Sequence, residues 1–348
     1  MNKQILPVVM NDQFVRLAVI DDYSSFIWSS RYYTTGDFQI IVDATPEYKS
    51  LFQEQYYLVR DDDENVGIIE DIFIERTEDG NDRLIVKGRF LDSIIARRII
   101  AVQTTVDGKV SDCIEQLLNE NIINPSNSAR QIDNFVIDSY EVATEMTAQY
   151  TGKNLLETIS AICETYGIGY KVTLNADNEF VFKLYEGVNR TYDQNVNDWV
   201  IFSDTYDNLI SSEYEENYGS IITAVLVAGE GEGLDRKTAW VGNDKTGLER
   251  YETYYDQRNI KSNDGEIPEE EYIELLKEAG KERLTKYTSA FTGKVYFENI
   301  NYKTDIGLGD LCVIQNDIWG VYINSRLVEV IESVDETGAY TITPTFGK

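Results

Sequence analysis

The C-terminal stretch, residues 305–348, constrains the fold most strongly, because short hydrophobic runs alternate there with turn residues. The runs at 311–314, 319–331 and 340–343 predict strands, and Pro344 is expected to close the last one. Glycine, asparagine and aspartate between the runs predict tight turns, which favours antiparallel hairpins. No catalytic motif occurs in this stretch. We therefore expect Gly307, Gly309, Asp310 and Gly347 to serve backbone geometry instead of binding a ligand.

The same alternation runs through residues 1–105. Hydrophobic segments at 14–19, 25–33, 38–42, 56–59, 66–74 and 83–88 predict six strands, with a hairpin turn at 78–82. Six strands joined by short turns predict a β-barrel or β-sandwich. A short helix over 91–100 is expected to pack on this first domain.

Residues 106–195 differ in pattern and predict a small α+β module. Ser111 is expected to cap a helix over 112–119, and Asn154 a second helix over 155–166 that ends at Gly167. A hairpin over 170–184 follows. Residues 196–348 return to β patterning and contain one helix, 268–287, that opens at Pro268. The predicted fold is mainly β with α+β insertions: two antiparallel β-barrel or sandwich domains around one α+β module.

Charge and composition exclude several function classes. The chain has 61 acidic and 31 basic residues, a net charge of −30, which opposes binding to DNA or to an anionic membrane surface. No segment approaches the roughly 20 apolar residues of a membrane span, and the first residues do not resemble a signal peptide. The three cysteines are far apart and odd in number, so they predict neither a disulfide framework nor a metal site.

The chain contains no histidine. Catalytic triads that need imidazole, HExxH zinc sites and histidine proton shuttles are therefore excluded. Any acid–base chemistry would depend on carboxylates, tyrosines or lysines, and we predict no catalytic residue, cofactor or metal ligand.

Two glycine- or acid-rich motifs resemble ligand sites only in part. Asp61, Asp63 and Asn65 have calcium-loop spacing, but Val66 stands where the loop needs glycine and Ile72 where it needs glutamate, which favours a solvated loop. Glycines at 229, 231 and 233 follow a predicted strand without GxGxxG spacing. We interpret Gly229 and Gly231 as a bulge or a close backbone approach.

Paired carboxylates and tryptophans could serve a carbohydrate-active protein. Glu70-Asp71 and the set Glu213, Glu215 and Glu216 could supply two catalytic acids, but neighbouring strand residues point to opposite faces. Core or interface packing is the preferred interpretation for the four tryptophans, although each could stack on a sugar: Trp28, Trp199, Trp240 and Trp319. A sequon at 189–191 carries little weight without a secretory signal.

Several short motifs together resemble the Gp37-like tail proteins of siphophages. They include the run from Trp28 to Phe38 with Gly36, the run 66–72 with Gly67, and the run 86–91 with Gly88. The segments 97–100, 152–156, 227–233 and 307–310, together with Gly347, continue the resemblance over nearly the whole chain. The resemblance implies a phage baseplate hub with two tube-like β-barrels in each chain, so that a homotrimer presents six similar barrels.

The same resemblance implies partners and a location. A hub of this kind would contact distal tail and tail tube proteins, the tape measure protein, and tail fibre or receptor-binding proteins. It would be made in the host bacterial cytoplasm and reside in the virion at the tail tip. An acidic lumen would let DNA pass without specific binding, because carboxylates repel phosphates. Plain solubility is the alternative explanation of the acidity.

Two functions from different classes thus remain open. A structural hub predicts a trimer without a catalytic cleft. A carbohydrate-binding module or a histidine-free glycoside hydrolase predicts a monomer with a tryptophan-lined groove and two carboxylates roughly 5–10 Å apart.

Overall fold

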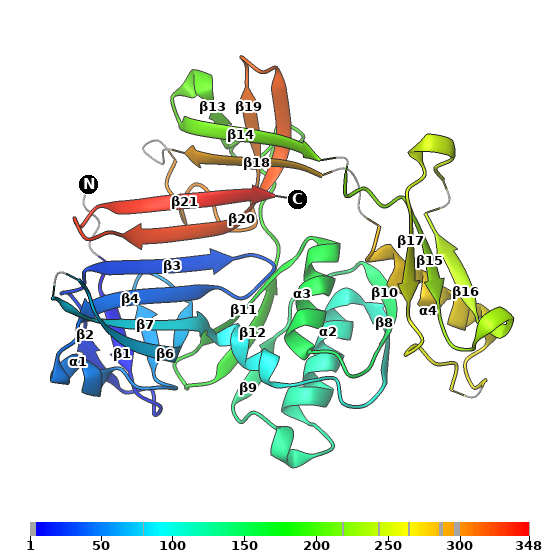
Figure 1. The fold of residues 1–348 in the computed structure, drawn as a ribbon, viewed down its shortest axis with the longest axis horizontal. Helices are drawn as coiled ribbons and strands as arrows, with labels where there is room; N and C mark the ends of the chain where they lie inside the picture. The colour runs from blue at the N-terminus through cyan, green and yellow to red at the C-terminus, as the bar shows by residue number, and fades with distance from the viewer. Residues whose placement is uncertain are drawn as a thin grey trace.

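A computed structural model describes residues 5–347 except 79, 218, 243, 264, 285–287 and 296–299. Its largest element is a 13-stranded sheet with the order β14-β18-β21-β20-β3-β4-β7-β6-β5-β1-β2, in which β19 pairs with β20 and β13 pairs with β19 (Figure 1). Its strands are β1 (Pro7–Met10), β2 (Arg16–Val19), β3 (Ser25–Arg31), β4 (Asp37–Asp43), β5 (Tyr57–Arg60), β6 (Val66–Arg76), β7 (Asp82–Phe90), β13 (Ile201–Ser203), β14 (Leu209–Asn217), β18 (Thr288–Val295), β19 (Leu311–Asn316), β20 (Val321–Val334) and β21 (Tyr340–Gly347).

The N-terminal strands form because apolar residues recur at every second position. In β4, Phe38, Ile40 and Val42 are buried while their neighbours are more exposed. They pack with Phe26 and Trp28 of β3 in one core cluster. The six predicted strands are thus confirmed, and β1 is a seventh that the sequence pattern did not predict. A short helix, α1 (Pro46–Leu51), follows β4 and is capped by Thr45.

The strand β20 joins the C-terminal and N-terminal regions. One of its edges pairs with β21, and the other pairs with β19 and then with β3, where Glu332 lies opposite Trp28. Two closed barrels were expected, but the described strands contain no closed barrel. The reason is that β20 continues past Ile331 to Val334. The part of its edge that lies beyond β19 pairs with β3, so the sheet continues into the N-terminal region instead of closing on itself. The strand β21 also runs through Pro344, which therefore does not end it.

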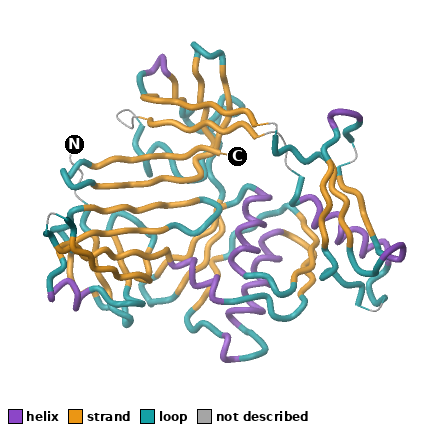
Figure 2. Tube along the Cα trace, viewed as in Figure 1, coloured by secondary structure: helices purple, strands orange, loops and turns teal. Residues whose placement is uncertain are grey.

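The α+β part of the chain lies beside this sheet, and Figure 2 shows the helices gathered there. Asn154 caps α3 as predicted, since its side chain accepts hydrogen bonds from the amides of Leu156 and Glu157, and Gly167 ends the helix at φ 71°. The prediction for Ser111 is wrong, because the helix begins at Val110 and Ser111 is buried in its first turn. The elements are η1 (Leu91–Arg97), β8 (Thr104–Lys109), α2 (Val110–Leu118), η2 (Asn119–Ile123), η3 (Ser128–Arg130), β9 (Phe135–Asp138), β10 (Glu145–Tyr150), α3 (Leu155–Tyr166), β11 (Gly169–Leu174) and β12 (Phe180–Tyr185).

A third unit consists of a three-stranded sheet and one helix. The order is β16-β15-β17, and α4 packs Tyr272, Leu275 and Leu276 against the sheet. Helix α4 begins after Pro268, as predicted, and ends at Lys281, while residues 285–287 of the prediction lie outside the described residues. The sequence also predicts a strand over 291–298 after this helix, and residues 296–298 of it lie outside the described residues. The remaining elements are η4 (Asp204–Tyr206), β15 (Ala224–Ala228), η5 (Gly233–Asp235), β16 (Thr238–Val241), η6 (Gly247–Glu249), β17 (Glu252–Asp256) and α4 (Glu269–Lys281).

The described helices include none that is long and apolar enough to cross a membrane.

The turn before β19 offers a matched test of glycine geometry. Gly309 has φ 93°, and a Cβ atom there would lie 2.2 Å from the Tyr32 ring, whereas a Cβ on Gly307 would meet nothing closer than 3.8 Å. We expect Gly309→Ala to lower the free energy of unfolding by about 2–4 kcal/mol, since it adds backbone strain and overlap. Gly307→Ala serves as the control and should change the free energy of unfolding by less than about 1 kcal/mol. Urea unfolding of both variants measures this; equal losses would contradict the assignment.

Candidate functional site: an acidic cleft between three parts of the chain

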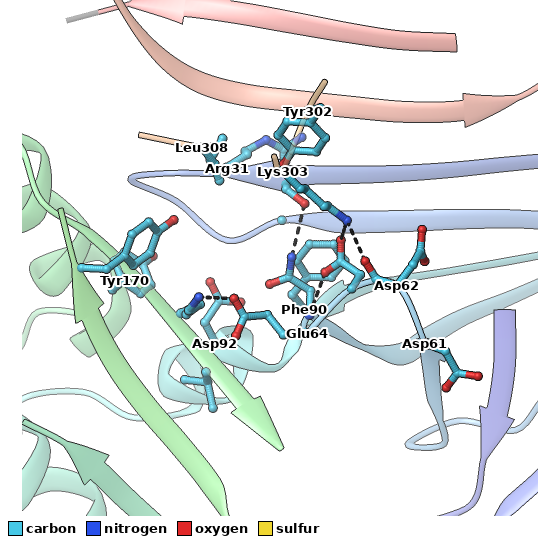
Figure 3. Close-up of a pocket in the computed structure, with 17 residues that line it drawn as sticks. Arg31, Asp61, Asp62, Glu64, Phe90, Asp92, Tyr170, Tyr302, Lys303 and Leu308 are labelled. Carbon is cyan, nitrogen blue, oxygen red and sulfur yellow. Dashed lines mark hydrogen bonds and ion pairs between the residues drawn. The ribbon is translucent and has the colours of Figure 1, made fainter. Parts of the chain in front are cut away.

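A cleft of about 590 Å³ lies where the N-terminal sheet, the α+β part and the loop before β19 meet (Figure 3). One wall is the loop from Asp61 to Asn65, between β5 and β6. Lys303 and Leu308 come from the loop before β19, and Phe90 and Asp92 lie at the start of η1. Tyr170 and Tyr185 complete the cleft from β11 and β12.

A buried ion pair lies directly beside this cleft. Arg60 ends β5 and donates two hydrogen bonds to Glu332 of β20, from Nη1 to Oε2 at 3.0 Å and from Nη2 to Oε1 at 3.1 Å. The exposed fractions of the two side chains are 0% and 2%. The Arg60 guanidinium also lies 5.6 Å from the centre of the Trp28 ring, within cation–π range. The pair therefore ties the first and last regions together inside the core.

The surroundings favour the ionised form of both partners. Burial alone would raise the pKa of Glu332, but hydrogen bonds and charge from Arg60, with Lys303 and Tyr340, outweigh it and lower that pKa to about 2. Tyr340 donates to Glu332 at 2.6 Å. Asp62 accepts two further hydrogen bonds from Arg60, at 2.8 and 2.9 Å. The guanidinium is thereby held between two carboxylates, an arrangement that its planar fork of donors suits.

The other charges of the cleft wall are also paired within the chain. Asp61 pairs with Arg16, Asp63 with Lys303 at 2.6 Å, and Glu64 with Lys171. Asn65 donates to Ser30 from its side chain and to Asp63 from its backbone amide. The residues with calcium-loop spacing thus act as partners for cations and turn amides of the same chain.

Asp92 is the exception in this wall. Its side chain is buried at the start of η1, and its Oδ1 atom has no hydrogen-bond partner among the described residues. Burial raises the pKa of Asp92 to about 7, although backbone amides and Thr35 nearby partly oppose the shift. Near neutral pH this carboxyl group therefore exists in both protonation states.

The loop before β19 is held by a second buried carboxylate. Asp310 accepts hydrogen bonds from the amides of Val188 and Gly307, at 2.7 and 2.9 Å, and from Arg190 Nε at 2.7 Å. Tyr32 packs its ring against Gly309, and its hydroxyl accepts from the amide of Gly187 at 3.2 Å. This contact joins β3, the α+β part and the C-terminal hairpins, so the cleft is the junction of the fold.

The comparisons with known proteins agree with this architecture. Residues 6–348 match the family described as "Siphovirus ReqiPepy6 Gp37-like protein". The chain belongs to this Gp37-like family. No curated protein matches it.

Solved phage tail proteins share the fold of this Gp37-like chain. A tail protein from Neisseria meningitidis MC58 is 14% identical with a TM-score of 0.58, over 99% of this chain and 97% of that one. The prophage MuSo2 43 kDa tail protein from Shewanella oneidensis is 12% identical with a TM-score of 0.56, over 98% of each chain. Prophage tail protein gp18 from Listeria monocytogenes EGD-e is 12% identical with a TM-score of 0.55, over 99% and 94%.

The glycines that carried the family resemblance lie at close contacts. A Cβ on Gly36 would lie 2.4 Å from the Phe90 ring, and one on Gly67 would lie 2.4 Å from the Phe38 ring. A Cβ on Gly88 would lie 1.7 Å from the Ile68 carbonyl oxygen, and a Cβ on Gly229 would lie 2.2 Å from the Tyr272 hydroxyl. Gly231 has φ 92°, and a Cβ on Gly347 would lie 3.2 Å from Val328 Cγ2, closer than ordinary van der Waals contact.

The structure corrects the argument about Glu70 and Asp71. The register of β6 against β7 shifts between Ile69 and Asp71, so Glu70 is the extra residue of a β-bulge, where strict alternation of faces fails. Both side chains line one shallow hollow with Lys87 and Arg89. Arg89 donates two hydrogen bonds to Glu70, at 2.7 and 2.8 Å. Glu213, Glu215 and Glu216 lie on the exposed strand β14.

The tryptophans have different environments. Trp28 is fully buried in the N-terminal core. Trp199 packs edge-on against Tyr192, and Trp319 lies in the turn between β19 and β20. Trp240 is partly exposed on β16. Asn189 of the sequon accepts hydrogen bonds from the amide and hydroxyl of Thr191.

Sequence reasoning missed the residues that build the junction: Tyr32, Arg60, Asp92, Gly187 and Glu332. Arg60 stands at the end of a hydrophobic run and is followed by five acidic or polar residues, 61–65, a pattern typical of a solvated strand end. The one sequence feature that pointed to the buried pair was Glu332, a charged residue directly after the long apolar strand predicted over 319–331.

Breaking the buried pair is expected to cost more than breaking an exposed one. Arg60→Met leaves the buried Glu332 carboxylate without its bidentate partner, with Lys303 at 3.5 Å and Tyr340 as its remaining contacts, so we expect the free energy of unfolding to fall by about 3–5 kcal/mol. Arg76 and Asp82 form a matched exposed pair. Arg76→Met should lower the free energy of unfolding by less than about 1 kcal/mol. Arg60→Met combined with Glu332→Leu should recover part of the loss. Equal effects at Arg60 and Arg76 in chemical denaturation would show that the buried pair does not stabilise the fold.

Asp92 predicts a pH dependence of stability. The folded chain keeps a proton up to about pH 7 that the unfolded chain releases near pH 3.9, so ionisation lowers stability as pH rises through this window. Asp92→Asn cannot ionise. Wild type should therefore lose stability between pH 5 and pH 8, whereas Asp92→Asn should not. The free energy of unfolding of Asp92→Asn minus that of wild type should rise by about 2–3 kcal/mol over this range. The exposed Asp177→Asn is the control and should show no such trend; a flat difference for Asp92→Asn would refute the assignment.

Proposed function

We propose that this chain is a structural component of a phage or prophage tail tip, a baseplate hub that closes the distal end of the tail tube and links it to fibre or tip proteins. The observation that carries the proposal is the shared fold: tail proteins from three different bacteria align over nearly their whole length with nearly all of this chain. The charged walls of the cleft beside the Arg60–Glu332 pair are engaged in holding the chain together, which favours a scaffolding role over catalysis.

The ends of the large sheet support assembly with other proteins. Strand β2 is an end strand, paired only with β1 among the described strands, and Val15, Leu17 and Val19 form an exposed apolar row along it. An exposed apolar edge is a template for pairing with another chain. The opposite end strand, β14, carries Glu213, Glu215 and Glu216. We propose a homotrimer in which each copy contributes two tube-like β domains, formed from residues 1–105 and 196–348, that close only in the assembly, with residues 106–195 as the module between them.

The net charge of −30 fits a passage for DNA. Carboxylates facing a lumen would repel the phosphate backbone and keep DNA from adhering. The proposed partners are distal tail and tail tube proteins, the tape measure protein, and fibre or receptor-binding proteins. The proposed location is the virion tail tip, after synthesis in the host bacterial cytoplasm. No cofactor and no enzymatic activity form part of this proposal.

Mass measurement and electron microscopy test the assembly. At high protein concentration we expect a species of three times the 39.8 kDa chain mass and ring-shaped particles with a central opening. Leu17→Asp should shift the population toward monomer, because it places a charge in the apolar edge. Ile318→Asp, at an exposed turn position outside that edge, is the control and should leave the population unchanged. A monomer at every concentration, with or without tail tube protein, would overturn the hub.

A further inference from the structure

The three-stranded sheet of the α4 unit presents one uncovered face. Helix α4 covers the other face through Tyr272, Leu275 and Leu276. On the uncovered face, Leu226 of β15 lies opposite Trp240 of β16 and also opposite Tyr254 of β17. These three side chains form a straight row across the sheet, here called the aromatic row. Trp240 is 38% exposed and Tyr254 is 55% exposed.

The two rings are two strand spacings apart, about 10 Å. They therefore provide two separate platforms on a nearly flat surface, with a smaller apolar side chain between them. Figure 1 shows this three-stranded sheet apart from the large sheet, at the edge of the molecule.

Fixed polar groups frame the aromatic row. Glu252 and Asp256 lie two positions on either side of Tyr254, and all three residues are exposed. Arg250 pairs with Glu252, and its guanidinium lies 4.9 Å from the centre of the Trp240 ring. Arg236 pairs with Asp256 and donates to the Tyr254 hydroxyl at 2.7 Å. Each ring thus has a guanidinium over one of its faces, at 4.9 Å for Trp240 and 5.9 Å for Tyr254, and a carboxylate holds each guanidinium in place. The opposite face of each ring is the proposed platform.

We propose that this face binds a ribbon-like glycan of β-1,4-linked pyranose rings. A pyranose ring has an apolar face of C–H groups that packs on an aromatic ring, and a rim of hydroxyls that hydrogen-bond with carboxylates and guanidinium groups. The β-1,4 linkage keeps successive rings in line, which matches a straight row with platforms at both ends. Glu252 accepts from Arg250 at Oε1, and its Oε2 atom has lone pairs for a sugar hydroxyl. Both carboxylate oxygens of Asp256 already accept from Arg236 and Arg258, so Asp256 serves to hold Arg236 in place.

The size and charge of the face favour a glycan over a macromolecule. Trp and Tyr side chains at these exposures leave roughly 200 Å² of aromatic surface, far below the roughly 800 Å² that each partner contributes to a typical protein interface. Glu252 and Asp256 at the row oppose the phosphates of a nucleic acid. The inference does not depend on the proposed hub, since it concerns a face outside the large sheet.

Isothermal titration of the full chain with cellohexaose, chitohexaose and maltohexaose tests the proposal. We expect binding to at least one of the two β-1,4-linked sugars and weaker or no binding to the curved maltohexaose. Trp240→Ala and Tyr254→Ala should each weaken binding roughly tenfold, since each loses one stacked ring. Trp240→Phe should retain part of the affinity. Trp319→Ala, at an exposed tryptophan outside this sheet, is the control and should bind like wild type.

Three results would overturn the proposal. They are the absence of binding to both β-1,4-linked sugars at millimolar concentration, an affinity that neither row substitution changes, and an equal loss in the Trp319→Ala control. Circular dichroism of each variant verifies that it is folded. Trimer formation is measured separately, so a failed hub and a failed glycan site give different results.

Discussion

A buried arginine–glutamate pair underlies the arrangement of this molecule. Arg60 ends an N-terminal strand and Glu332 lies in the penultimate strand of the chain, so their two hydrogen bonds join residues 272 positions apart in the sequence. Burying both charges costs free energy that only good geometry and further hydrogen bonds recover. Asp62, Tyr340 and the Trp28 ring supply those contacts. The pair therefore ties β5 to β20, the strand that also pairs with β3.

The pairing of β20 with β3 has consequences for function. Because β20 extends the C-terminal hairpins into the N-terminal sheet, thirteen of the described strands form one open sheet with the exposed end strands β2 and β14. An open sheet with an apolar edge suits a subunit that completes its structure by assembly. Apart from Asp92, the charges described in the wall of the cleft beside the pair are paired within the chain. The α4 unit, in contrast, leaves an ordered aromatic face uncovered, and binding is most expected there.

The local sequence predicted individual elements well where one physical signal dominates. Alternating apolar residues located β4 and β7, Asn154 and Gly167 marked both ends of α3, and Pro268 marked the start of α4. Predictions failed where a local signal was overridden by packing. Ser111 is a good cap residue but is buried inside α2, and Pro344 lies within β21. The bulge at Glu70 broke the alternation on which the argument about opposite faces depended.

The sequence by itself determined the β-rich class, the family, the absence of histidine chemistry and the strongly acidic character, because these depend on composition and on short-range patterns. Only the tertiary structure decided which strands became neighbours. Pairing partners hundreds of residues apart leave no local signal, so neither the single open sheet nor the Arg60–Glu332 pair could be read from the chain. The alignment of Trp240, Leu226 and Tyr254 likewise depends on the register of three strands, which hydrogen bonding between strands alone defines.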